Sequence, residues 1–214
     1  MPYRSPDKRA ITPQGRGRFP GFDALDELGR WDDVTAGVVL SRLAPTTDLA
    51  FFTAEEDAAA TALCDLLLAQ HTEPKVPVVA LIDHRLATGE TDGWHYDDMP
   101  ADPLAWQQTL AALDAEAREQ HGTSFALLDA SAETTIIQRI QDLANRGEHW
   151  CQWPAARVWS LWTRYACTAF YSHPWSWSEI GFGGPAYPRG YKNLGVDSRE
   201  RWEVADHVGR DPRS

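Results

Sequence analysis

Apolar residues recur at steps of three and four through the middle of the chain, and this spacing predicts helices rather than strands. The clearest helix begins at Thr53, because Thr53-Ala54-Glu55-Glu56 has the form of a capping box. In such a box the threonine oxygen and the glutamate carboxylate each accept a backbone N–H that the helix leaves unpaired. We expect this helix to run to about Gln70, with its leucines facing a core.

Four further helices are predicted from proline, glycine and capping residues at their ends. Pro77 suits the first turn of a helix from Pro77 to Ala87, since its missing N–H would be unpaired there. Asp102 is the expected N-cap of the next helix, with Pro103 in its first turn and Gly122 closing it. The remaining two are expected from about Ala132 to Asn145, capped by Ser131, and from Pro154 to near Ser172.

The other segments have a weaker pattern. Residues 23–50 contain a short amphipathic candidate around Leu25 and an apolar stretch, Val34 to Leu43, whose structure the spacing does not decide. Thr88 to Pro100 mixes glycines, acids and aromatic residues, which is typical of a surface loop. No alternation of strand length is present, so the predicted class is mainly α, a single helical domain of about five helices.

We expect this domain to span residues 23–197, between an extended basic arm (1–22) and a charged tail (198–214). The whole chain has 214 residues and a formal charge of -11, which disfavours nucleic acid and anionic membrane as partners. No run approaches the roughly 20 apolar residues that span a bilayer. Without a recognisable export signal, the expected location is the cytoplasm.

The sequence offers residues for two kinds of catalytic site, and neither is favoured. His84, His95, Asp97 and Asp98 offer metal ligands, but their spacing matches no metal motif, and solvated loop residues are the simpler explanation. Cys151 lies close to His149, yet no third residue is indicated to orient a nucleophilic pair. We expect the remaining cysteines, Cys64 and Cys167, to be inert core residues.

The most informative segment runs from Trp150 to Tyr191 and contains six of the ten tryptophans. From Ser172 onward, large aromatics alternate with glycine and proline, which predicts a fixed irregular loop rather than helix or central strand. Its aromatic side chains either complete the core of the chain itself or anchor a protein interface, where Trp, Tyr and Arg are enriched. The composition leaves both readings open.

The chain resembles the gluconate 2-dehydrogenase subunit 3 family over roughly Phe51 to Tyr191. Two blocks carry the resemblance: Phe51-Phe52-Thr53-Ala54-Glu55-Glu56 with Ala62-Leu63-Cys64-Asp65, and Ala169-Phe170-Tyr171-Ser172-His173-Pro174 with the glycine-rich run to Gly190-Tyr191. The resemblance implies a noncatalytic helical subunit that binds, stabilises or assists maturation of a large dehydrogenase of the glucose-methanol-choline type. FAD would belong to that partner, and this chain would hold no cofactor.

Some members of the family serve a complex with an electron-acceptor protein, and some carry a twin-arginine export signal, which is not seen here. We expect the C-terminal segment to supply the partner interface, through Phe170, Tyr171, His173, Pro174, Trp175, Trp177, Phe182, Gly183, Gly184, Tyr187, Arg189 and Tyr191. The alternative is a stand-alone helical sugar-binding protein or enzyme with a pocket at this loop and His173 or Glu179 as acid or base.

Overall fold

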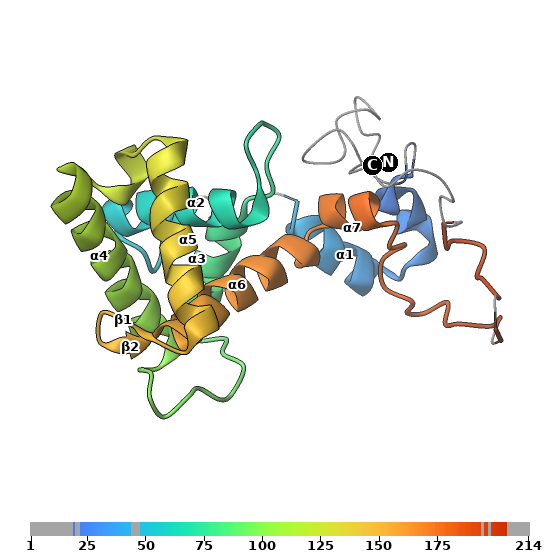
Figure 1. The fold of residues 1–214 in the computed structure, drawn as a ribbon. Coiled ribbons are helices and arrows are strands. Elements are labelled where there is room, and N and C mark those ends of the chain that lie inside the picture. Colours follow the sequence, from blue (N-terminus) through green and yellow to red (C-terminus); the bar gives the residue numbers. More distant parts are fainter. Residues whose placement is uncertain (1–18, 20–21, 44–47, 194, 197, 205–214) are drawn as a thin grey trace. The chain divides into compact units, whose positions relative to one another are not determined.

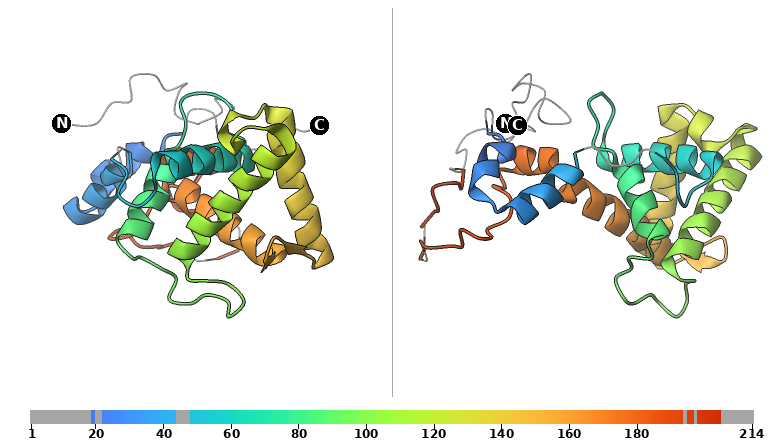
Figure 2. Two further views of the ribbon diagram at one scale, coloured as in Figure 1. Left: turned by 90° about the vertical axis from the view of Figure 1, so that its left-hand side faces the viewer. Right: turned by 180° about the vertical axis from the view of Figure 1, so that it is seen from behind.

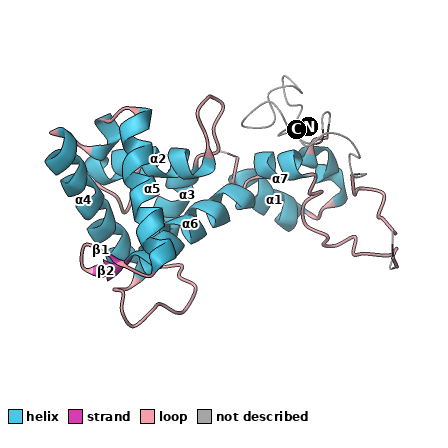
Figure 3. Ribbon diagram, in the orientation of Figure 1, coloured by secondary structure: helices cyan, strands magenta, loops and turns pink. Residues whose placement is uncertain are grey.

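The computed structural model describes residues 19, 22–43, 48–193, 195–196 and 198–204 (Figure 1). Helices dominate these residues and strands form only one small hairpin, so the mainly α class is confirmed (Figure 3). The chain divides into two compact units. Unit 1 comprises Met1–Pro45, Thr72–Val76 and Tyr171–Ser214, and unit 2 comprises Thr46–His71 and Pro77–Phe170. Most of the predicted arm and tail lies outside the described residues.

Helix α2 (Ala54–Leu68) opens unit 2 and has the predicted capping box. Thr53 Oγ1 accepts the backbone N–H of Glu56 at 3.2 Å, and Glu56 Oε2 accepts that of Thr53 at 2.9 Å. The chain entering α2 is held by Asp83, whose buried carboxylate accepts the backbone N–H groups of Ala50, Phe51 and Phe52 at 2.8 to 3.0 Å. This carboxylate lies on α3 (Val78–Ala87), for which Pro77 is the N-cap rather than a first-turn residue.

Helix α4 (Asp102–His121) ends at Gly122 as expected, with φ 76, but its predicted N-cap is wrong. Ala101 occupies the cap position, and no side chain caps the helix. Asp102 instead accepts the hydroxyl of Tyr165 at 2.8 Å and the guanidinium of Arg164 at 3.0 Å. A short-range sequence pattern cannot show this, because both partners lie more than sixty residues away.

Helix α5 (Ala130–Arg146) begins earlier than predicted, because Asp129 and not Ser131 is its N-cap. The Asp129 carboxylate accepts two backbone N–H groups, those of Ser131 and Ala132. Gly147 ends the helix in the left-handed region, as expected. A two-stranded antiparallel hairpin follows, formed by β1 (His149–Trp150) and β2 (Trp153–Pro154).

Helix α6 (Ala155–Ser172) begins one residue later than predicted, because Pro154 pairs with His149 in the hairpin. Its inward face completes a core rich in aromatic residues. The rings of Trp106 and Tyr165 meet edge to face at 5.8 Å, and the Trp162 indole donates to Thr109 at 3.0 Å. Helix α2 packs against α3, α4 and the short helix η2 (Phe125–Leu127), as Figure 2 shows from two sides.

The two cysteines expected in the core differ from one another. Cys64 is buried on α2, and burial raises the pKa of its thiol, which fits an inert residue. Cys167 is exposed on α6, so its predicted core position is wrong. Its apolar sequence neighbours face inward, whereas position 167 falls on the outer side of the same helix.

Unit 1 contains η1 (Ala24–Arg30), α1 (Asp33–Ser41) and α7 (Pro174–Ile180). The presence of α7 corrects the prediction of an irregular loop from residue 172 onward. Pro174 lies in the first turn, where it needs no hydrogen-bond donor, and His173 caps the helix. Gly181 ends α7 with φ 75. Proline and glycine therefore bound a short helix here rather than excluding one.

Candidate partner interface

Trp177 lies at the centre of unit 1. It is 4% exposed and belongs to a cluster with Ala24, Leu25, Trp31 and Val39. Its indole N–H donates to the carbonyl of Tyr171 at 2.7 Å, which joins α7 to the end of α6. Trp177 therefore supports the fold of unit 1, in agreement with the reading in which the aromatic segment completes the chain's own core.

Gly184 allows the segment after α7 to approach this core closely. A Cβ at this position would lie 2.4 Å from Trp31 Cζ2, and the backbone has φ 76. The indole N–H of Trp31 also donates to the carbonyl of Pro185 at 2.9 Å. A residue with a side chain would meet both a steric clash and backbone strain here.

Arg189 connects the segment after α7 to η1. Its guanidinium forms a 2.7 Å ion pair with Glu27 and donates to the carbonyl of Gly183 at 2.7 Å. The guanidinium also lies over the ring of Trp202, 4.2 Å from its centroid. Arg189 was predicted as an interface residue, and these contacts use its two terminal nitrogens within unit 1.

His173 is completely buried at the N-terminus of α7. Its Nδ1 accepts the backbone N–H of Trp175 at 3.2 Å, so the proton of the neutral ring lies on Nε2. Among the described residues, Nε2 has no hydrogen-bond partner. Burial, with a smaller contribution from Arg42, lowers the pKa of His173 to about 4. The imidazole is therefore neutral at physiological pH and does not face solvent.

A second group of the predicted residues is exposed. Tyr171 is 50% exposed, Phe182 42%, Tyr187 66% and Tyr191 54%. Trp175 is half-buried, whereas Pro174 and Gly183 are buried. Phe170 is 8% exposed and belongs to unit 2. The segment thus has an inner set that stabilises unit 1 and an outer set of aromatic rings that faces solvent.

Sequence reasoning missed an exposed apolar surface on α1. Val34 is 76% exposed and Val38, one turn later, is 50% exposed, while Val39 is buried. An exposed apolar stripe on a helix is a surface that a partner can cover. The available signal was the run Val34 to Leu43, in which the polar side chains are limited to Thr35, Ser41 and Arg42.

The described residues concentrate their exposed large apolar side chains in unit 1. They are Val34, Val38, Leu40, Tyr171, Ile180, Phe182, Tyr187, Tyr191 and Val196 in unit 1, against Leu49, Trp94, Leu104 and Leu127 in unit 2.

Glu179, the other acid or base of the alternative function, is half-buried, and burial raises its pKa.

Within the described residues no group of three or more His, Cys, Asp and Glu side chains is placed to hold a metal ion, and His84, His95, Asp97 and Asp98 form no such group. In the same part of the chain, no helix combines the length and the apolar character that a membrane span requires.

Comparison with protein families gives a match to gluconate 2-dehydrogenase subunit 3 over residues 54–184, which is more than half of the 214 residues. No match is found among curated proteins or solved structures. The match includes α2 and α7, whereas Tyr187, Arg189 and Tyr191 lie beyond it. The resemblance seen in the two sequence blocks is confirmed, and the chain belongs to the gluconate 2-dehydrogenase subunit 3 family.

Proposed function

We propose that this chain is a noncatalytic accessory subunit that binds and stabilises a large FAD-dependent dehydrogenase of the glucose-methanol-choline type. The family is named for one subunit of a larger enzyme, which supports a role in a hetero-oligomer. The observation that carries the proposal is the set of exposed large apolar side chains in unit 1, on the C-terminal segment and on α1.

This surface has the composition of a binding site. Burying apolar area stabilises association by about 25 cal/mol per Å². Tyrosine side chains also carry a hydroxyl group that can form a hydrogen bond at the edge of an interface. Tyr187 and Tyr191 supply such side chains, and Val34 and Val38 supply apolar area. We call these four residues, together with Tyr171 and Phe182, the outer surface of unit 1.

The inner residues give this surface a fixed base. Trp177, Gly184 and Arg189 hold the segment that carries Phe182 and Tyr187 against η1 and Trp31. A surface that is ordered before binding loses less conformational entropy on association. In the proposed complex the dehydrogenase subunit carries FAD, oxidises the sugar or alcohol and passes electrons to an acceptor protein.

The alternative of a stand-alone sugar-binding protein or enzyme has less support. As an enzyme it would use His173 or Glu179 as acid or base, yet the His173 side chain is 0% exposed and its Nδ1 caps α7. Catalytic acids and bases need to lie within hydrogen-bond reach of the reacting group. The buried position of His173 favours a structural role instead.

The test compares single alanine substitutions at side chains that have similar exposed fractions. Tyr187→Ala and Val34→Ala remove exposed side chains of unit 1, whereas Leu127→Ala removes one that is 74% exposed in unit 2. We expect each unit 1 variant to raise the Kd for the purified dehydrogenase subunit at least about tenfold, as interface anchors do. Leu127→Ala should bind as the unchanged chain does, and equal binding by all three variants would refute the proposed surface.

A further inference from the structure

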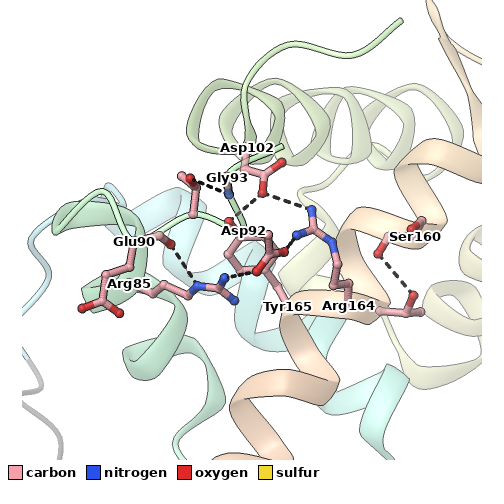
Figure 4. Close-up of polar contacts among 10 residues, drawn as sticks. Arg85, Glu90, Asp92, Gly93, Asp102, Ser160, Arg164 and Tyr165 are labelled. Atoms are coloured by element: carbon pink, nitrogen blue, oxygen red, sulfur yellow. Dashed lines mark hydrogen bonds and ion pairs between the residues drawn. The ribbon is translucent and has the colours of Figure 1, made fainter. Parts of the chain in front are cut away.

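Loop 88–101 of unit 2 is held by three arginines from two helices. Arg85 of α3 and Arg164 of α6 both form ion pairs with Asp92, which lies between them in Figure 4. Arg85 also donates to the carbonyl of Glu90 at 2.9 Å. Arg157 pairs with Asp98 at 3.4 Å, near the other end of the loop. A loop of this length is therefore fixed along most of its course.

The same arginines alternate with aromatic rings. The guanidinium of Arg164 lies 5.0 Å from the ring centroid of Tyr165 and 5.2 Å from that of Trp94. Trp94 meets Tyr96 edge to face at 5.1 Å, and Arg157 lies 3.6 Å from the Tyr96 centroid. The side chain of Trp94 is thus supported from within unit 2 on two sides.

Trp94 nevertheless faces solvent. It is 50% exposed, whereas Trp31, Trp106, Trp150, Trp153, Trp162 and Trp177 are at most 7% exposed. Tryptophan has the largest side chain that can bury apolar area. Leaving its indole exposed gives up much of the stability that this burial would contribute. Long loops without secondary structure are uncommon in compact folds unless they bind something. A rigid loop that presents a tryptophan has the properties of a preorganised binding anchor.

The charges around Trp94 indicate the partner surface that fits it. The loop carries two exposed acids, Glu90 and Asp97, besides the acids that pair with arginines. Arg85 and Arg164 are only 20% and 22% exposed at the side chain, and both are paired with Asp92. The exposed side chains of the loop thus include Trp94, His95 and several carboxylates, and the indole together with these carboxylates complements an apolar pocket with a basic rim.

We propose that loop 88–101 is a second docking element of this subunit, in which Trp94 inserts into an apolar, basic-rimmed pocket of the large dehydrogenase subunit. This inference rests on the proposed function, because it takes the same partner, and it adds a site in unit 2 to the outer surface of unit 1. The positioning residues are Arg164 and Asp92, which act through Trp94 and the loop.

The test measures association of the full chain with the purified dehydrogenase subunit. Trp94→Ala should raise the Kd at least about tenfold, and Trp94→Phe should recover part of that loss. The double variant Glu90→Gln, Asp97→Asn should slow association and weaken its dependence on salt, since charges at a rim mainly steer encounter. Tyr187→Ala serves as the parallel variant in unit 1.

A second readout needs no enzymatic activity. Acrylamide should quench the tryptophan fluorescence of the free chain more than that of the complex, and this difference should be smaller in Trp94→Phe, because Trp94 is one of ten tryptophans. The inference is overturned if Trp94→Ala binds like the unchanged chain while Tyr187→Ala binds weakly, a result that leaves the proposed function intact. If the unchanged chain does not bind the dehydrogenase at all, both proposals fail.

Discussion

Arg189 and Glu27 are 162 residues apart in the chain and form a 2.7 Å ion pair with side chains that are 8% and 13% exposed. This pair joins the segment after α7 to η1, near the start of the described chain. Because the pair is largely shielded from water, its loss leaves a charge with little solvation. Unit 1 therefore depends on contacts between its first and last segments.

Replacing Arg189 should destabilise unit 1. Arg189→Met removes the ion pair and the hydrogen bond to Gly183 but keeps part of the apolar stem. We expect the free energy of unfolding to fall by about 2 to 4 kcal/mol, since among the described residues Glu27 then keeps the exposed Arg30 as its ion-pair partner. Urea unfolding measures this change. Arg201→Met, at an exposed position, is the control, and an equal effect of both variants would contradict the assignment.

Alanine substitutions at Gly184 and Gly190 form a matched pair. Gly184 and Gly190 both have positive φ, at 76 and 64, but only Gly184 faces a side chain within 4 Å. Gly190→Ala should cost about 1 kcal/mol from backbone strain alone. Gly184→Ala should cost about 1 to 3 kcal/mol more, because the new methyl group overlaps Trp31. Similar melting temperatures for the two variants would show that Trp31 does not pack here as described.

The stability of unit 1 should fall as the pH decreases from 6.5 to 4. Burial lowers the pKa of His173 to about 4 in the folded chain, from the ordinary value of 6.5. Between these values the unfolded chain binds a proton that the folded chain does not, so protonation favours unfolding. The shift corresponds to about 3 kcal/mol. Above pH 6.5 this residue contributes no pH dependence.

His173→Asn tests the origin of that dependence. An asparagine oxygen can still cap α7 at the Trp175 N–H, but it takes up no proton. Urea unfolding at pH 7 and pH 4.5 should therefore show a smaller loss of stability in this variant. If the loss is unchanged, another group is responsible.

Tyr165 should ionise only at high pH. Burial and the hydrogen bond to Asp102 raise the pKa of this phenol to about 12, from the ordinary value of 10.0. In Asp102→Asn, the loss of the adjacent charge should lower the pKa of Tyr165, which ultraviolet titration detects as earlier tyrosinate formation. Tyr165→Phe identifies its contribution among the six tyrosines. A titration curve that is the same in Asp102→Asn would contradict the proposed electrostatics.

Local sequence signals predicted much of the fold and failed where distant contacts decide the structure. The capping box at Thr53 is complete within four residues, and the helix it predicts is present. At Asp102 the same logic failed, because Arg164 and Tyr165 bind the carboxylate from α6. The choice of Ser131 over Asp129 failed because a carboxylate two residues earlier accepts two amides at once.

The binding surface was predictable only in part. Composition identified the aromatic segment but could not separate Trp177, which is buried, from Tyr187, which is exposed. That separation depends on Trp31 and Val39, which lie more than a hundred residues earlier. Residue type also could not show that Trp94 faces solvent, because its position depends on arginines from two helices.

The most direct test of the account is co-expression of this chain with the flavoprotein dehydrogenase encoded nearest to it, followed by size-exclusion chromatography with absorbance read at a flavin wavelength and at 280 nm. The proposed accessory role predicts that the chain elutes with the flavin, and that Tyr187→Ala shifts it to a separate, later peak. Elution of the unchanged chain alone, as a stable monomer free of flavin, would contradict the role.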